Sequence, residues 1–122
     1  MDNFIFLDHP QELNMENSHV IIMNSSITSK EELMSDFNIK LCLPNYFAHN
    51  WDSLYDCLFS LDWIEQQNLV LIYEYIPNLD NETLVQLLSI LKDAMNTWNK
   101  DDRYQIHIVF PKNSYQRIHE LI

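Results

Sequence analysis

The chain has 122 residues, enough for one domain with a substantial core, and 47% of them are hydrophobic, which argues against disorder. It carries 18 acidic and 7 basic side chains, a formal net charge of −11, and no glycine. This charge disfavours direct binding to nucleic acid or anionic membranes, and the lack of glycine excludes the Gly-rich phosphate loops and dinucleotide fingerprints of many nucleotide-dependent enzymes.

The first half of the chain predicts one strand and two helices. The apolar, β-rich run over 19–23 is typical of a buried strand. Thr28 and Ser29, followed three residues later by Glu31 and Glu32, offer capping-box signals that predict a helix to about Phe37. A second helix is expected over 50–63, from its N-cap to about Trp63.

The second half predicts two further strands around a longer helix. The continuous apolar run over 69–73 indicates a second buried strand. The alternating run over 104–110, ended by Pro111, predicts a third strand. Asp80 is a good N-cap for the helix between them, whose apolar residues repeat with a period near 3.6: Leu84, Leu87, Leu88, Leu91, Met95 and Trp98.

This order of elements favours one architecture. Strands that alternate with helices are typical of parallel pairing through right-handed crossovers. We therefore expect a single domain with an α/β fold, a three-stranded parallel sheet packed with three to four helices. No apolar run suggests a signal peptide or a membrane span, and two cysteines, Cys42 and Cys57, make no disulfide framework. A cytoplasmic protein is expected, with Cys57 buried as a small hydrophobic residue.

The segment 43–58 is the most informative part of the chain. Pro44 biases the residue before it toward an extended conformation, so a helix is expected to begin only after this aromatic turn. Asn50 is a good N-cap for that helix. One apolar stripe then faces the core, made by Leu54, Cys57, Leu58 and Leu61.

The other face of this helix carries residues that contribute little to folding. Asp52 and Asp56 lie one turn apart, where like charges repel by about 0.2–0.5 kcal/mol, and Tyr55 and Phe59 add aromatic rings. The helix dipole favours an anion in the first turn, so Asp52 also has a structural explanation. Asp56 could be an ordinary solvated charge, and Tyr55 or Phe59 could pack under a neighbouring loop. Together with Tyr46 in the preceding turn, these residues form an acidic and aromatic face, and interface centres favour aromatic anchors. The pattern indicates a surface that receives a cationic partner.

The charge distribution points to the same kind of partner. No lysine or arginine occurs between Lys40 and Lys92, whereas acidic residues continue throughout this region: Asp52, Asp56, Asp62, Glu65, Glu74, Asp80 and Glu82. A field of one sign raises the rate of encounter with an oppositely charged protein. Because proteins that bind nucleic acid contact its phosphates through basic side chains, an acidic surface can occupy such a site as a phosphate mimic.

The order Pro-x-Tyr-Phe-x-x-Asn-Trp-Asp-x-Leu-Tyr-Asp-Cys-Leu over 44–58 resembles the signature of the barstar family, small intracellular inhibitors of secreted ribonucleases. The resemblance implies the same order of strands and helices as the periodicity does. It also implies that Tyr46, Asn50, Asp52 and Asp56 contact the ribonuclease. Asp56 would occupy the phosphate site of the nuclease and face its Arg and His side chains.

The resemblance further implies an acidic contact from the third helix, at Asp80 or Glu82. Two positions depart from the family pattern. Tyr55 stands where tryptophan is common, and Ala48 replaces a turn glycine, which would cost about 1–2 kcal/mol of strain if that backbone has a positive φ. The predicted partner-binding residues are Tyr46, Asn50, Trp51, Asp52, Tyr55, Asp56, Phe59, Asp80 and Glu82.

The chain is also longer at both ends than the short family members. The segments 1–18 and 111–122 are expected to be extensions of one barstar-like domain. We expect an edge strand around 4–7 and a short terminal helix around 114–121.

These observations predict an inhibitor or immunity protein that occludes the active site of a ribonuclease or nuclease toxin. We expect it to be a monomer before binding, without enzymatic activity, cofactor or metal. Two other interpretations stay open. An enzyme could use Asp52, Asp56 and His49 as acid, base or metal ligands, although the chain offers no second ligand cluster and no nucleophile motif. A general acidic interaction or regulatory module, or a homodimer, could use the same aromatic face.

Overall fold

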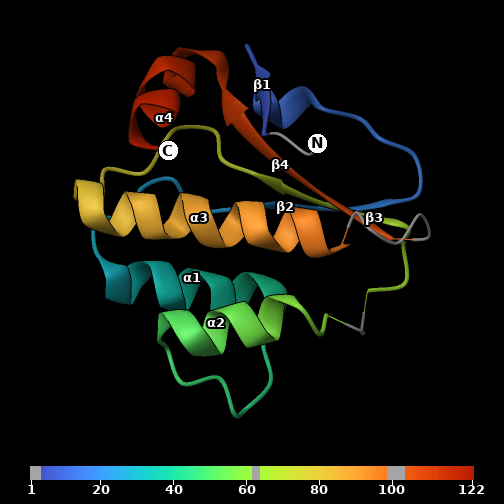
Figure 1. The fold of residues 1–122 in the computed structure, drawn as a ribbon. Helices are drawn as coiled ribbons and strands as arrows, with labels where there is room; N and C mark the ends of the chain where they lie inside the picture. The colour runs from blue at the N-terminus through green and yellow to red at the C-terminus, as the bar shows by residue number, and fades with distance from the viewer. Residues whose placement is uncertain (1–3, 62–63, 99–103) are drawn as a thin grey trace.

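The computed structural model describes residues 4–61, 64–98 and 104–122, and strands alternate with helices along most of the chain (Figure 1). The elements are β1 (Ile5–Leu7), η1 (Pro10–Glu12), β2 (Ser18–Ile22), α1 (Lys30–Leu41), α2 (Trp51–Leu58), β3 (Asn68–Ile72), α3 (Asn81–Trp98), β4 (Gln105–Pro111), η2 (Lys112–Ser114) and α4 (Tyr115–Leu121).

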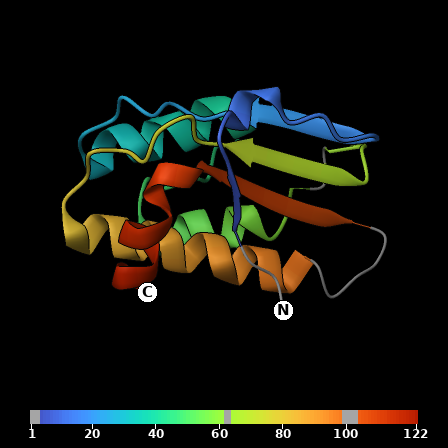
Figure 2. The ribbon, with the colours of Figure 1, turned by 90° about the horizontal axis from the view of Figure 1, so that it is seen from above.

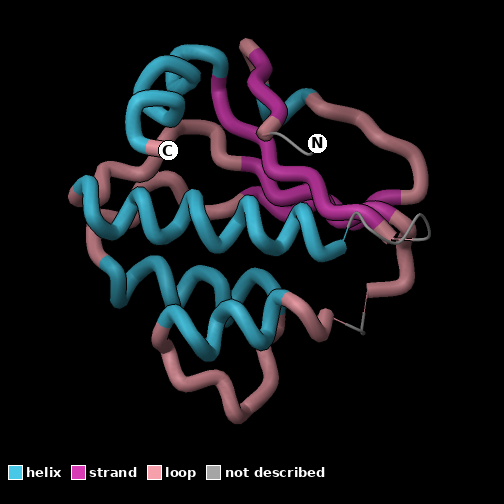
Figure 3. The backbone as a smooth tube through the Cα atoms, in the orientation of Figure 1, coloured by secondary structure: helices cyan, strands magenta, loops and turns pink. Residues whose placement is uncertain are grey.

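The strands form one parallel sheet in the order β1-β4-β3-β2 (Figure 3). Val20 of β2 lies opposite Val70 of β3, which lies opposite His107 of β4. The expected α/β fold with a parallel sheet is confirmed, but the described residues form a sheet of four strands rather than three. The fourth strand is β1, near the edge strand expected around 4–7, and it pairs with the side of β4 that faces away from β3.

Helices α1, α2 and α3 lie on one face of the sheet, with α2 farthest from the strands (Figures 1 and 2). Their apolar stripes pack with sheet residues such as Leu71 and Ile108 into the main core. Cys57 is buried in this core, as expected from its position on the stripe of α2. The core therefore carries α2 as an outer helix with one side left for solvent.

The opposite face of the sheet has a smaller core. Val70, Ile72 and Val109 are buried there. The chain between β1 and β2 crosses this face and packs Leu13 and Met15 against them (Figure 2). The N-terminal segment thus covers part of a sheet face that the helices leave open.

Of the two capping pairs predicted at the start of α1, Ser29 and Glu32 form one, with Ser29 as the N-cap. The backbone N–H of Glu32 donates to Ser29 Oγ at 3.1 Å, and Glu32 Oε1 accepts from the backbone N–H of Thr28 at 3.2 Å. The helix continues past Phe37 to Leu41, because Leu41 is buried and extends the apolar stripe by another turn.

The expected end of α2 near Trp63 is wrong for the described residues, because the helix ends at Leu58. The N–H of Phe59 is shared between the carbonyls of Tyr55 and Asp56, each at 3.3 Å, and Ser60 Oγ donates to the Asp56 carbonyl at 3.0 Å. These bonds tighten the last turn and satisfy its carbonyls locally. Trp63 itself lies outside the described residues.

Left-handed backbone conformations occur at Asn17, Cys42 and His49 among the described residues. Cys42 follows the last residue of α1 and has φ 49, the usual conformation after a helix C-terminus. Ala48 does not have a positive φ, so the backbone strain considered for alanine does not occur at this position. The next residue, His49, has the positive φ of this turn, 55°.

The two ends of the chain pack against each other. Phe6 of β1 lies 6.5 Å from the ring of Phe110 and 4.9 Å from that of Tyr115, between ring centroids. Tyr115 begins α4, which matches the short terminal helix expected around 114–121. In Figure 1, α4 and α2 lie at opposite sides of the molecule.

Lysine protects the outer edge of β2. Lys40 Nζ donates to the carbonyl oxygen of Ile22 at 2.7 Å and lies 3.5 Å from Asp36 Oδ1. The second carboxylate oxygen of Asp36, which is buried, accepts from the backbone N–H of Asn24 at 2.9 Å. The network joins α1 to the end of β2.

Within the described part of the chain, no helix is long and apolar enough to cross a membrane. In the same residues, no three His, Cys, Asp or Glu side chains are grouped so that they could hold a metal ion.

Candidate functional site

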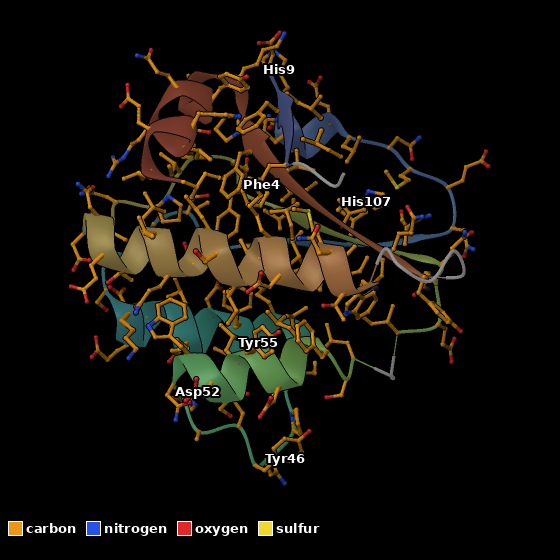
Figure 4. The ribbon with its side chains drawn as sticks, in the orientation of Figure 1. Phe4, His9, Tyr46, Asp52, Tyr55 and His107 are labelled. Atoms are coloured by element: carbon orange, nitrogen blue, oxygen red, sulfur yellow. The ribbon has the colours of Figure 1, made fainter. Side chains whose placement is uncertain are left out.

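The loop between α1 and α2 presents Tyr46 at its tip, where 68% of the residue is exposed (Figure 4). The loop is anchored by Phe47, which is buried and donates its backbone N–H to the carbonyl of Pro44 at 2.9 Å. Ser53 Oγ accepts the backbone N–H of Ala48 at 2.9 Å and ties the loop to the first turn of α2. A folded loop therefore holds an exposed tyrosine.

Asn50 is the N-cap of α2, as its sequence position predicts. Its side-chain oxygen accepts the backbone N–H of Ser53 at 2.8 Å. Trp51 follows and is half-buried against the main core, with Lys30 Nζ at 5.8 Å from its ring centre. Trp51 therefore anchors the start of the helix rather than projecting freely into solvent.

Asp52 and Asp56 are both exposed on the outer side of α2. Within the described residues, neither carboxylate forms an ion pair with the protein's own lysines, arginines or histidines. Two negative charges one turn apart thus remain hydrated and unneutralised. Such carboxylates accept hydrogen bonds from cationic donors without first having to break an internal pair.

The rings of Tyr55 and Phe59 make an edge-to-face contact with centroids 4.0 Å apart. Tyr55 is 37% exposed, whereas Phe59 is half-buried and packs against the main core. The interpretation that both rings lie on a solvent face is therefore met for Tyr55 and only in part for Phe59. Phe59 supports the tyrosine ring from behind, and Tyr55 is the aromatic group presented outward.

A groove of about 250 Å³ runs between α2 and α3 beside these residues. It brings Asp93, an exposed residue of α3, to the same hollow as Asp52 and Tyr55. The remaining lining residues are Trp51, Val85, Gln86, Ser89 and Ile90. The groove joins a second helix to the acidic face, and we refer to Asp52, Tyr55, Asp56 and Asp93 as the acidic face below.

Asp93 did not figure among the residues predicted from the sequence. Its signal is a polar stripe on α3, Gln86, Ser89 and Asp93, at i, i+3 and i+7, which lies away from the leucine stripe. That stripe identifies a solvent-facing side of α3, but only the packing of α3 beside α2 shows that it borders Asp52.

The two residues expected to supply the acidic contact from the third helix lie elsewhere. Asp80 Oδ1 accepts the backbone N–H of Thr83 at 2.7 Å, so Asp80 caps α3, as the sequence also predicts. This bond holds the pKa of the Asp80 carboxyl below its usual value. Glu82 is in the first turn of α3, and neither residue lines the groove.

His49, considered as a possible metal or acid–base group, has its ring tilted against that of Phe47 with centroids 4.7 Å apart. It is exposed in the loop before α2. Its left-handed backbone makes it a turn residue that positions the start of α2.

A parallel sheet with helices on one face, and an outer helix that carries unpaired carboxylates and rings, defines a small α/β protein of barstar-like architecture. The family model described as Barstar (barnase inhibitor) matches residues 17–111, and the chain belongs to this family. Strand β1 and helix α4 lie outside the matched residues. Members of the family are ribonuclease inhibitors and not enzymes. No curated protein matches the chain closely enough to count as a relative.

Proposed function

We propose that this protein is an immunity protein that inhibits a ribonuclease or nuclease toxin by covering its active site with the acidic face. The observation that carries the proposal is the pair of exposed carboxylates, Asp52 and Asp56, without an internal ion pair within the described residues. Family membership supports a ribonuclease as the partner.

The chemistry follows from what a nuclease active site contains. Arg, Lys and His side chains there bind the phosphates of RNA, and carboxylates held at similar positions can accept the same hydrogen bonds. Asp56 is proposed to take the phosphate position, and Tyr46 and Asn50 to flank it. Because the acidic face is preformed on a helix, little ordering is needed on binding.

The groove adds a second point of attachment. Asp52 of α2 and Asp93 of α3 both line the groove between these helices, together with the ring of Tyr55. A guanidinium group can pair with carboxylates and stack on an aromatic ring at the same time. We propose that the groove holds a basic side chain of the nuclease.

The proposed partner is therefore a basic nuclease domain, met in the cytoplasm of the cell that makes the inhibitor. The excess of acidic over basic side chains, a formal net charge of −11, speeds this encounter and disfavours direct contact with RNA.

The test is inhibition of the nuclease encoded beside this protein, measured with the wild-type protein and with Asp56→Asn. Truncating one member of a buried charge pair at an interface costs about 2–5 kcal/mol of binding free energy, and complexes of this family are among those from which this range was obtained. The affinity of Asp56→Asn should therefore fall at least about 30-fold. Glu120→Gln on α4 makes the same change in net charge far from α2 and should leave inhibition within about threefold. Equal inhibition by wild type and Asp56→Asn would contradict the proposed face.

A further inference from the structure

Lys30 lies at the border of the acidic face. It is the first residue of α1, and Trp51 is the first residue of α2. Lys30 Nζ lies over the indole of Trp51, at 5.8 Å from the ring centre, so the two helices begin side by side. The same indole lines the groove together with Asp52. A positive charge is therefore held at the edge of a surface whose own charged residues are all aspartates.

The ring of Trp51 limits where this ammonium group lies. Trp51 is half-buried and packs against the main core, so its indole is a fixed surface. Lys30 is half-buried as well, and an ammonium group is attracted to the face of an aromatic ring. The cation is thus partly ordered before a partner arrives, and a contact made through it costs less conformational entropy than one made by a freely moving lysine.

Lys30 has no carboxylate of this chain as its partner. Lys40, at the other end of α1, lies 3.5 Å from Asp36. Among the described residues, no carboxylate forms an ion pair with Lys30, and this includes the nearby Asp52. Glu32, in the same helical turn as Lys30, is instead engaged in the capping box of α1. The charge of Lys30 is therefore available to a carboxylate from another protein.

A cation at this border affects which proteins can cover the acidic face. When the acidic face meets the basic groups of a nuclease, Lys30 comes against a nuclease residue beside those groups. An acidic residue at that place is attracted, whereas a lysine or arginine there is repelled, and like charges brought together across an interface cost affinity. Specific interfaces commonly use such a repulsive element to reject similar partners.

We propose that Lys30 is a specificity-determining residue that pairs with an aspartate or glutamate of the nuclease outside its phosphate-binding site. The inference rests on the proposed function, and it adds one attraction of opposite sign to those of the acidic face. A nuclease with a carboxylate at this place binds tightly. A nuclease with a basic residue there is rejected, even when its phosphate site accepts Asp56.

The first experiment reverses the charge. Lys30→Glu lowers the net charge by two, so the general attraction to a basic nuclease should become stronger. We nevertheless expect the affinity for the cognate nuclease to fall at least about tenfold, because the new carboxylate faces a carboxylate of the nuclease. Lys30→Arg retains the charge and the attraction to the indole, and it should bind within about threefold of wild type. Unchanged or tighter binding of Lys30→Glu would overturn the proposal.

Lys112→Glu is the matched control. It makes the same change in charge directly before α4, on the opposite side of the molecule from α2. The pair that Lys112 forms with Asp8, at 3.8 Å, is exposed on both sides, so its loss should have little effect. Lys112→Glu should bind the nuclease at least as tightly as wild type. Equal losses of affinity in Lys112→Glu and Lys30→Glu would show that position 30 has no specific contact.

The second experiment identifies the partner carboxylate by double-mutant cycles. Aspartates and glutamates around the active site of the nuclease are replaced one at a time by asparagine or glutamine. Each nuclease variant is then measured with wild type and with Lys30→Gln. One nuclease residue should show a coupling of at least about fivefold with Lys30, whereas a lysine that only supports the indole of Trp51 would couple to none. Absence of any coupled residue would refute the pairing.

The two proposals fail in different ways. A strong loss with Asp56→Asn, together with no loss in Lys30→Glu, rejects the contact at Lys30 and keeps the acidic face. No loss with Asp56→Asn rejects the acidic face as the inhibitory surface. The double-mutant cycles then still decide whether Lys30 pairs with a carboxylate of the nuclease.

Discussion

The indole of Trp98 on α3 donates a hydrogen bond to the carbonyl oxygen of Leu58, the last residue of α2. The last carbonyls of a helix have no partner within the helix, so a side chain of one helix satisfies the end of its neighbour. This bond fixes the end of α2 against α3.

Replacing this donor should weaken the fold. In Trp98→Phe an aromatic ring is retained but the carbonyl of Leu58 loses its partner, so the free energy of unfolding should fall by about 1–2 kcal/mol. Urea denaturation measures it. Trp51→Phe, a change at the other end of α2, is the reference for general loss of indole packing. A Trp98→Phe protein as stable as wild type would show that the bond contributes nothing.

Asp93 should contribute to binding, and Glu82 should not. Both are acidic residues of α3, but only Asp93 lines the groove with Asp52 and Tyr55. Asp93→Asn should weaken inhibition of the cognate nuclease about tenfold, and Glu82→Gln should change it by less than about twofold. Because both variants remove one negative charge from the same helix, equal effects would point to the overall charge rather than to the groove.

Tyr73→Phe should stabilise the protein. The side chain of Tyr73 is completely buried, stacks on Phe110 at 5.2 Å between centroids, and finds no hydrogen-bond partner for its hydroxyl among the described residues. Burial raises the pKa of this hydroxyl well above its usual value. Removing a buried polar atom that lacks a partner should raise the free energy of unfolding by about 1 kcal/mol.

Tyr75 provides the matched control for this change, because 69% of it is exposed. Tyr75→Phe should alter stability by no more than about 0.5 kcal/mol. A loss of stability in Tyr73→Phe, measured by thermal and urea denaturation, would indicate that the hydroxyl has a partner in solution.

Cys42→Gly should also stabilise the fold. Cys42 has φ 49 directly after α1, where a side chain with a Cβ atom is strained and glycine is not. The relief of strain, reduced by the greater freedom of glycine in the unfolded chain, should give about 0.5–1 kcal/mol. Cys42→Ala retains the Cβ atom and should give no such gain. Equal stabilities of the glycine and alanine variants in urea would contradict the strain.

Acid should destabilise the protein through its helix caps. Hydrogen bonds from Thr83 to Asp80, and from the side chain and backbone of Thr28 to Glu32, hold the pKa values of both carboxyls below their usual values. The folded state therefore binds these protons less tightly than the unfolded state. The stability that the two carboxylates contribute is present above their unfolded pKa values, near 4, and is lost as the pH falls through the folded values.

Asp80→Asn separates the charge from the cap. Asparagine caps a helix about as well as aspartate but does not titrate in this range. The free energy of unfolding of Asp80→Asn should therefore fall less steeply than that of wild type between about pH 5 and pH 3. Parallel pH profiles for the two proteins would show that Asp80 is not perturbed by folding.

Local signals in the sequence predicted much of the fold. The continuous apolar run over 69–73 became β3 at the centre of the sheet, where both faces are covered. The pairing of Ser29 with Glu32, and the cap at Asn50, needed only hydrogen bonds between near neighbours. Features that depend on a few adjacent residues can be recognised without knowledge of the tertiary fold.

Features that depend on packing were missed or misplaced. The end of α2 was placed too late, because the hydroxyl of Ser60 competes for a helix carbonyl in a way that apolar periodicity does not reveal. Asp93 was not predicted because it comes near Asp52 only when α2 and α3 pack side by side. Two of the three left-handed residues described are Cys42 and His49, and neither is a residue type that favours this conformation as asparagine does.

The edges of the sheet affect the tendency of the protein to aggregate at high concentration. In the described structure, β1 occupies one flank of β4, and the other outermost strand, β2, has the carbonyl of Ile22 already engaged by the ammonium group of Lys40. A second copy that tried to add its own strand there would have to displace this charge. Concentrated solutions should consequently resist fibre growth, and replacing Lys40 by a neutral residue would remove that protection.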